Sequence, residues 1–154
     1  MTRRGSDPST IGESELDDEL RRAAEFRSAL RHFSARTEEV AASAGLTPQR
    51  YDLLLAIRAG VDATSTVTQL SQQLRLRQTA VTELVKRAEE AGLVLRAPSR
   101  EDGRVTVIRL SGEGRRRLLR AFLALQSDRD QLRLALQEVG ARFRALGDGH
   151  GRRA

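Results

Sequence analysis

The chain has no cysteine, and this absence excludes several kinds of chemistry at once. Without thiols there are no disulfides, no thiolate metal sites and no cysteine-based redox sensing. The two histidines, His32 and His150, are far apart in the sequence, and no cluster has the spacing of a metal site. We therefore expect neither a metal nor a cofactor. Aromatic residues are only 3% of the 154 residues, so a core has to consist mainly of leucine, valine and alanine.

Long hydrophobic runs are also absent. No stretch approaches the roughly 18 apolar residues that cross a membrane, and the first 14 residues have no apolar segment of the kind found in signal peptides. We therefore expect no membrane partner and a cytoplasmic location. The sequence also lacks a Ser-His-Asp set, a Walker loop and a Gly-x-Gly-x-x-Gly stretch, so we do not expect an enzyme.

Lysine is almost missing, since Lys86 is the only one, yet the chain is basic, with a formal net charge of +6. A basic excess favours partners with phosphate or other anionic surfaces. A GC-rich genome also favours arginine over lysine, so the preference for arginine does not by itself indicate that these side chains recognise bases or phosphates with two hydrogen bonds each. An ordinary solvated basic surface remains the alternative until the charges are placed on a fold.

Apolar periodicity and capping residues predict a mostly helical chain. Gly45 and Gly92 have the positions of helix C-caps, and Thr47-Pro48 has the pattern of an N-cap followed by proline in the first turn. The predicted elements are a helix over 15–44, a helix from Thr47 to near Gly60, a short strand at the end of the 61–68 loop, helices over 69–76 and 77–92, strands over 93–97 and 105–110, and helical structure after Ser111. The arm 1–14 and the tail 147–154 are expected to be disordered.

The last helical stretch has a heptad-like row of apolar residues, interrupted by Arg129. Ser127 with Asp130 resembles a capping box, and Gly140 is a possible break, so a continuous helix and a broken one both remain open. We favour a long helix to about Glu138 followed by a short one.

Two short helices with a tight connection, followed by a β-hairpin, are typical of a winged helix-turn-helix, in which the second helix enters the DNA major groove. Here that helix is 77–91. Its outer face and the preceding turn carry side chains that can contact bases or phosphates: Thr68, Arg75, Arg77, Gln78, Thr79, Thr82, Lys86 and Arg87. A solvated helix surface is the alternative interpretation.

The turn between the two strands, SREDGR, contains candidate wing residues. Arg100 or Arg104 can supply a cation to a minor groove or a phosphate. Asp102 is expected to accept backbone N–H bonds and to pair with the arginine, and Gly103 is expected to adopt the positive φ of a tight tip. The alternative is a hairpin made soluble by its charges.

These motifs resemble the MarR family of winged-helix transcriptional regulators. The resemblance lies in the wing DGRVTVIRLSGEG (102–114), in LTPQRYDLLLAI (46–57) and in the helix-turn-helix LSQQLRLRQTAVTELVKRAEEAGLV (70–94). The sequence departs from the family pattern at Arg75, where glycine is common, and at Gln78, where arginine or another polar residue is common. The expected final helix is also short for the family.

The resemblance implies a mainly α fold with a small β-hairpin wing, in one domain over 15–146. Residues 47–111 form its DNA-binding lobe, and 15–45 and 112–146 form dimerisation helices. It implies a homodimer that binds a pseudopalindromic operator in double-stranded DNA, as a repressor, with a small aromatic effector as a candidate ligand. The expected interface residues are Leu16, Leu20, Leu30, Leu132, Leu136 and Phe143, and the alternative is that these helices form a bundle within one chain. The expected effector cleft contains Phe26, Phe33, Tyr51 and Phe122, although aromatic residues at helical spacing usually belong to a core. The alternative function is a winged-helix protein-interaction module that does not recognise a DNA sequence.

Overall fold

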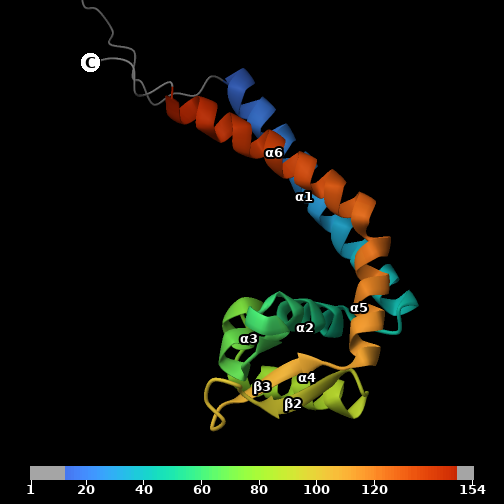
Figure 1. Ribbon diagram of the computed structural model, residues 1–154. Helices are drawn as coiled ribbons and strands as arrows, with labels where there is room; N and C mark the ends of the chain where they lie inside the picture. Colours follow the sequence, from blue (N-terminus) through green and yellow to red (C-terminus); the bar gives the residue numbers. More distant parts are fainter. Residues whose placement is uncertain (1–12, 149–154) are drawn as a thin grey trace, which may run out of the picture. The chain divides into compact units, whose positions relative to one another are not determined.

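The computed structural model describes the backbone of residues 13–148 and the side-chain exposure of residues 14 and 16–137. The elements in chain order are α1 (Glu13–Ser43), α2 (Pro48–Ala59), the short turn η1 (Val61–Ala63), β1 (Thr64–Ser65), α3 (Val67–Leu74), α4 (Gln78–Glu90), β2 (Val94–Pro98), β3 (Thr106–Leu110), α5 (Gly112–Ala124) and α6 (Gln126–Asp148) (Figure 1). The predicted fold class, mainly helical with a small β-hairpin, is confirmed. The predictions for the arm and the tail lie almost wholly outside the described residues.

The chain divides into two compact units. One comprises residues 35–127 and contains the helix-turn-helix and the sheet. The other takes in the described parts of 1–34 and 128–154, which belong to α1 and α6. The predicted boundaries at 45 and 112 stay predictions, although α5 belongs to the first unit, where it packs on α2 and β3.

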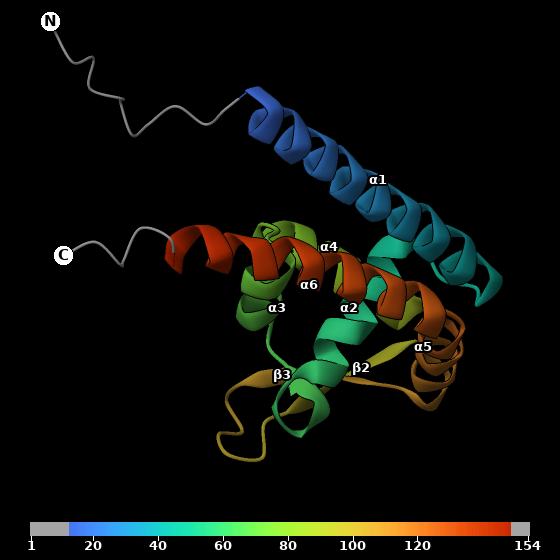
Figure 2. The same cartoon turned by 90° about the horizontal axis from the view of Figure 1, so that it is seen from above.

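The sheet of the 35–127 unit has three antiparallel strands in the order β1-β3-β2. The hairpin register pairs Val94 with Leu110 at its base and Pro98 with Thr106 at its outer end. A short strand was expected at the end of the 61–68 loop; the observed β1 lies earlier, at Thr64–Ser65, and pairs Thr64 with Arg109. Helix α2 crosses this sheet (Figure 2) and also packs on α3, α4 and α5, so it is the central element of the lobe.

Local signals set most of the helix ends. Gly45 and Gly92 both have φ of 72°, a backbone conformation that side chains with a Cβ disfavour. Thr47 caps α2, since its hydroxyl accepts the Arg50 N–H at 3.2 Å, and Pro48 is the first helical residue, as predicted.

The core lies between α2, α3, α4 and the sheet, with further residues from the end of α1 and from α5. Its largest fully buried side chains are Leu53, Leu54, Ile57, Leu70, Leu93, Ile108, Leu125, Val81, Val85 and Val94. The apolar spacing of 47–60 predicts Tyr51, Leu54, Leu55 and Ile57 as the inward face of α2. Three of these are buried, but Leu55 is 37% exposed, and Leu53 is buried in its place. Leu55 instead lines two surface hollows.

Helix α3 begins earlier than predicted, at Val67 rather than Gln69. Thr66 is its N-cap: the Thr66 hydroxyl accepts the Gln69 N–H at 3.2 Å, and the Gln69 side chain accepts the Thr66 N–H at 2.8 Å. This reciprocal capping box satisfies two otherwise unpaired backbone donors. The β-branched run TVT suggested extended chain, and the cap overrides that local preference.

The favoured prediction for the last helix is wrong. The break falls at Leu125, whose φ of −91° and ψ of 8° leave the helical range, and α6 then runs without interruption from Gln126 past Gly140 to Asp148. Leu125 is 1% exposed, so its side chain is held in the core of the 35–127 unit where the helix changes. The break lies close to the alternative position at Ser127, and Asp128 gives α6 an acidic first turn, which suits a helix start.

The second unit has no buried side chain among its described residues. Leu16, Leu20, Leu30, Leu134 and Leu136 are between 37% and 60% exposed. Its surface carries short-range ion pairs, such as Arg21 with Asp18 at 2.9 Å. None of the helices within residues 13–148 has both the length and the apolar character that crossing a membrane requires.

Candidate nucleic-acid interface

The turn between α3 and α4 is held by one serine. The Ser71 hydroxyl donates to the Leu76 carbonyl at 2.6 Å, while the Ser71 carbonyl accepts the Leu76 N–H at 3.1 Å and also that of Arg75. These bonds close the turn, and they leave the side chains of Arg75, Leu76 and Arg77 exposed at the start of α4. The turn therefore presents two arginine side chains ahead of the second helix.

Arg75 has φ of 53° and ψ of 40°, the left-handed conformation. A residue with a Cβ pays roughly 1–2 kcal/mol for this geometry, which explains why glycine suits the position. At this position the chain therefore has a charged arginine in a strained backbone conformation, where the family commonly has an unstrained glycine.

Helix α4 buries one face and exposes the other. Val81, Val85 and Ala88 are fully buried, and Leu84 packs partly buried against the core. The exposed side contains the predicted residues Gln78, Thr79, Thr82, Lys86 and Arg87. The structure therefore places these five on one accessible helix surface, in the same unit as the turn and the hairpin.

Two hydrogen bonds restrain the start of this surface. The Gln78 side-chain Nε2 donates to the Thr68 hydroxyl oxygen at 3.4 Å, and the Thr82 hydroxyl donates to the Gln78 carbonyl at 2.8 Å. Thr68, predicted as a phosphate contact, is exposed in the first turn of α3. Its contact with Gln78 was not foreseen, because it joins residues of two different helices.

The loop of residues 99–105 projects from the lobe beyond the sheet (Figure 1). Arg100, Asp102, Gly103 and Arg104 are all exposed in it. As predicted, the Asp102 carboxylate accepts a backbone N–H, that of Arg104, at 3.0 Å, and the Asp102 carbonyl accepts the Val105 N–H at 2.9 Å. Asp102 therefore braces the turn through the backbone.

Two parts of the wing prediction are corrected. Within the described residues no ion pair joins the Asp102 carboxylate to the Arg104 guanidinium, so the carboxylate holds the backbone of Arg104 rather than its charge. Gly103 is not one of the glycines with positive φ, and a Cβ added to it would meet open space. The bonds from Asp102 close the turn without the left-handed residue that a two-residue hairpin loop requires.

The base of the hairpin is joined to both neighbouring helices through Ser111. Its N–H donates to the Leu93 carbonyl at 3.0 Å, its hydroxyl donates to the Gly92 carbonyl at 2.6 Å, and the hydroxyl oxygen accepts the Gly114 N–H at 2.9 Å. The backbones meet closely here, because a Cβ on Gly114 would lie 2.0 Å from the Leu93 carbonyl oxygen. On the other side of the hairpin, Arg96 of β2 pairs with Glu89 of α4 at 3.1 Å.

Glu113 in the first turn of α5 accepts hydrogen bonds from Arg117 and Arg116, and these contacts hold the pKa of its carboxyl below the ordinary value. Arg117 also donates to the Gly45 carbonyl at 2.9 Å, which connects α5 to the end of α1. Arg116 and Arg117 therefore form contacts within the chain, with Glu113 and, for Arg117, with Gly45 as well.

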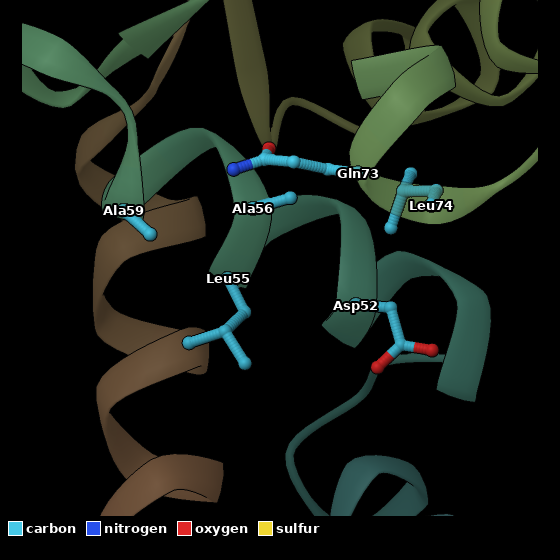
Figure 3. A pocket seen from close by; sticks show the side chains of 6 residues that line it. All are labelled: Asp52, Leu55, Ala56, Ala59, Gln73 and Leu74. Atoms are coloured by element: carbon cyan, nitrogen blue, oxygen red, sulfur yellow. The ribbon is translucent and has the colours of Figure 1, made fainter. Parts of the chain in front are cut away.

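A surface hollow of about 450 Å³ lies between α2 and α3 (Figure 3). Four of its residues come from α2, namely Asp52, Leu55, Ala56 and Ala59, and two from α3, Gln73 and Leu74. Partial burial raises the pKa of the Asp52 carboxyl. No group of acidic or histidine residues in the described chain is arranged to hold a metal ion.

A second cavity, of about 410 Å³, lies between α2 and α5. Its walls are Leu55, Ala59, Leu118, Leu119 and Phe122, with Arg58 and Arg115 beside them. Of the four residues predicted for an effector cleft, Phe122 lines this cavity, whereas Tyr51 is only 5% exposed and belongs to the core. Phe26 and Phe33 are half-buried in the other unit. Sequence periodicity did not identify Arg58 and Arg115, because their proximity depends on how α2 packs on α5.

Comparison with known proteins identifies the fold. A profile of the MarR family matches residues 44–105, whereas no curated protein sequence gives a significant match. A MarR family transcription regulator, SP03579, is 21% identical, with 91% of this chain and 98% of that chain covered and a TM-score of 0.64. BldR of Sulfolobus solfataricus, a transcriptional regulator, is 20% identical, with 93% and 100% covered and a TM-score of 0.56.

A mutant of MarR from E. coli, solved in complex with operator DNA, is 18% identical to this chain. The match covers 86% of this chain and 96% of that chain, with a TM-score of 0.62. The profile covers the helix-turn-helix, β2 and the hairpin loop, whose geometry is described above, and it ends just before β3. Residues 44–105 therefore match the MarR family, and the described chain has the fold of MarR-family transcription regulators.

Proposed function

We propose that this chain is a sequence-specific regulator of transcription that binds double-stranded DNA. In this proposal the exposed face of α4 lies in the major groove, and the hairpin loop lies along the adjacent backbone or minor groove. The observation that carries the proposal is the exposed row on α4, where Gln78, Thr79 and Thr82 precede Lys86 and Arg87. Polar side chains suited to base edges are thus followed by cations suited to phosphates.

The E. coli MarR mutant in complex with operator DNA supports this proposal, since its chain has the same fold. The test is to select bound duplexes from a random pool and then to measure affinity for the selected site across a salt series. We expect one preferred site, bound far more tightly than random DNA, and a steep linear loss of log affinity with log salt. A protein-interaction module with this fold would show neither behaviour.

We further propose that the chain acts as a homodimer on a pseudopalindromic operator. The exposed leucines of the second unit support it, because Leu16, Leu20, Leu30 and Leu136 remain 37–59% exposed in the single chain and a partner could cover them. Leu132 is half-buried, and Phe143 lies on α6 beyond the described side chains. Two lobes on one DNA face would need half-sites about 10 bp apart.

Replacement of Leu132 by Asp should break this dimer, because it would bury an unpaired charge in the interface. The matched control is Gln131→Asp, which introduces the same charge at the exposed neighbouring position. Sedimentation at micromolar concentration should give a dimer for the wild type and the control, and a monomer or unfolded chain for Leu132→Asp. A monomeric wild type would contradict the dimer but not DNA binding.

The mode of action in this proposal is repression, relieved by a small aromatic effector. The cavity between α2 and α5 supports the second part, because it combines an apolar wall at Leu118, Leu119 and Phe122 with the cations of Arg58 and Arg115. An aromatic compound with an anionic group fits that chemistry. Deletion of the gene should raise transcription next to the selected site, and the compound should release the wild type from DNA more readily than Phe122→Ala.

A further inference from the structure

The contact between Gln78 and Thr68 limits what Gln78 can offer to DNA. The side-chain Nε2 of Gln78 donates to the Thr68 hydroxyl oxygen at 3.4 Å, from the first residue of α4 to the first turn of α3. A glutamine amide has two N–H donors and one carbonyl acceptor. With one donor used inside the lobe, one N–H and the carbonyl oxygen remain.

The main chain of the same residue is also held. The Thr82 hydroxyl donates to the Gln78 carbonyl at 2.8 Å, one helical turn later. Gln78 is thus restrained at its backbone by α4 and at the end of its side chain by α3. Restraint at both ends lowers the conformational entropy that a long side chain loses when it binds.

The remaining donor and acceptor match one base better than the others. In the major groove adenine displays an acceptor, N7, beside a donor, the N6 amino group. One N–H and one carbonyl oxygen satisfy this pair. Guanine displays two acceptors, N7 and O6, which would call for two donors, and the donor bonded to Thr68 is no longer free.

We propose that Thr68 is a positioning residue that orients the Gln78 carboxamide and so sets a preference for adenine in the bound DNA. This inference rests on the proposed function, because it requires that α4 enter the major groove. It differs from the role predicted from the sequence, in which Thr68 contacts a phosphate. A phosphate contact would add affinity for every sequence equally, whereas a positioning role changes the ranking of sequences.

The experiment uses the full chain and the duplex selected by the wild type, with the four bases placed in turn at the position where Gln78→Ala abolishes discrimination. Thr68→Val removes the hydroxyl at almost constant shape, and Thr68→Ser keeps it. We expect Thr68→Val to lose about fivefold in affinity for the adenine duplex, the value of one ordinary hydrogen bond, and less than twofold for the other three. Thr68→Ser should keep the wild-type ranking.

A double-mutant cycle completes the test. In a Gln78→Ala background, Thr68→Val should cause no further change in discrimination, because the group it orients is gone. An equal loss on all four duplexes, an unchanged preference in Thr68→Val, or a wild-type preference other than adenine would overturn the inference. Thermal unfolding checks that each variant folds, and Thr68→Ala replaces the valine variant if that one does not.

These outcomes are distinct from failure of the proposed function itself. If the wild type selected no sequence from the random pool, sequence-specific DNA binding would be wrong and the role of Thr68 would fall with it. If the wild type selected a site and Thr68→Val ranked the four duplexes as the wild type does, only the role of Thr68 would be wrong.

Discussion

The wing residue Asp102 permits a test in which charge and structure are changed separately. Asp102→Asn removes the negative charge but keeps a side-chain oxygen that can accept the Arg104 N–H, which Asp102 binds at 3.0 Å. Asp102→Ala removes the same charge and also that acceptor. The difference between the two variants therefore isolates the contribution of the turn bond to DNA binding.

The expected magnitudes follow from simple estimates. A carboxylate about 8 Å from a phosphate in water is repelled by about 0.5 kcal/mol, and physiological salt screens part of this. Asp102→Asn should therefore bind DNA up to about twofold more tightly at low salt, with the gain fading as salt rises. The bond to the Arg104 N–H is exposed and contributes about 0.5–1 kcal/mol, so Asp102→Ala should bind two- to fivefold more weakly than Asp102→Asn.

Fluorescence anisotropy with one labelled duplex at several salt concentrations measures both differences, after thermal unfolding has shown that both variants fold. Arg104→Ala serves as the reference for a lost cation, and its salt slope should be about one unit shallower if Arg104 contacts one phosphate. Equal affinity of the alanine and asparagine variants at every salt concentration would refute the bracing role of Asp102.

Three further predictions concern the stability of the lobe. Gly114→Ala should destabilise it by about 3 kcal/mol or more, because the added Cβ would lie 2.0 Å from the Leu93 carbonyl oxygen. The control Gly112→Ala should be tolerated, because its Cβ would come no closer than 3.8 Å to the flexible end of Arg116. Similar denaturant midpoints for the two variants would contradict this. Arg75→Gly should be about 1 kcal/mol more stable than Arg75→Ala, because only glycine adopts the left-handed backbone conformation without strain. Both variants lose the same cation and should lose the same DNA affinity. Equal stabilities would show that the turn stores no strain. Arg117 and Arg116 lower the pKa of the Glu113 carboxyl, so the contribution of this group to stability should be complete above the ordinary pKa of 4.5 and should decline as pH falls through the lowered pKa. Glu113→Gln should flatten this part of the pH–stability curve. An unchanged curve would count against the role of these contacts.

The sequence allowed prediction of features that depend on short stretches of chain. The caps at Gly45, Thr47, Gly92 and Ser111 were predicted because each follows from one residue type at one end of a periodic segment. The hairpin was predicted for the same reason, from two β-rich runs around a charged turn. Such signals are local, and the fold did not override them.

Features that depend on packing were missed. No proline or glycine marks the helix break at Leu125 in the sequence. The break occurs where the buried Leu125 side chain holds the end of α5 in the core. Leu53 is buried and Leu55 is exposed because of the side of α2 that packs on α3 and the sheet. The Thr68–Gln78 bond and the arginines beside the α2–α5 cavity likewise require two helices to be placed together.

The junction at Ser111 has a consequence for how such proteins diversify. Its bonds to Gly92 and Leu93 close the base of the hairpin, and Val94 and Ile108 hold the two strands in the core, so only the loop between Pro98 and Thr106 projects from the lobe. Insertions, deletions or a transplanted loop between the ends of β2 and β3 can change the length and charge of the wing without moving α4 or α5. If the hairpin lies along DNA as proposed, such changes would alter how far it reaches along the duplex while the helices of the lobe keep their positions.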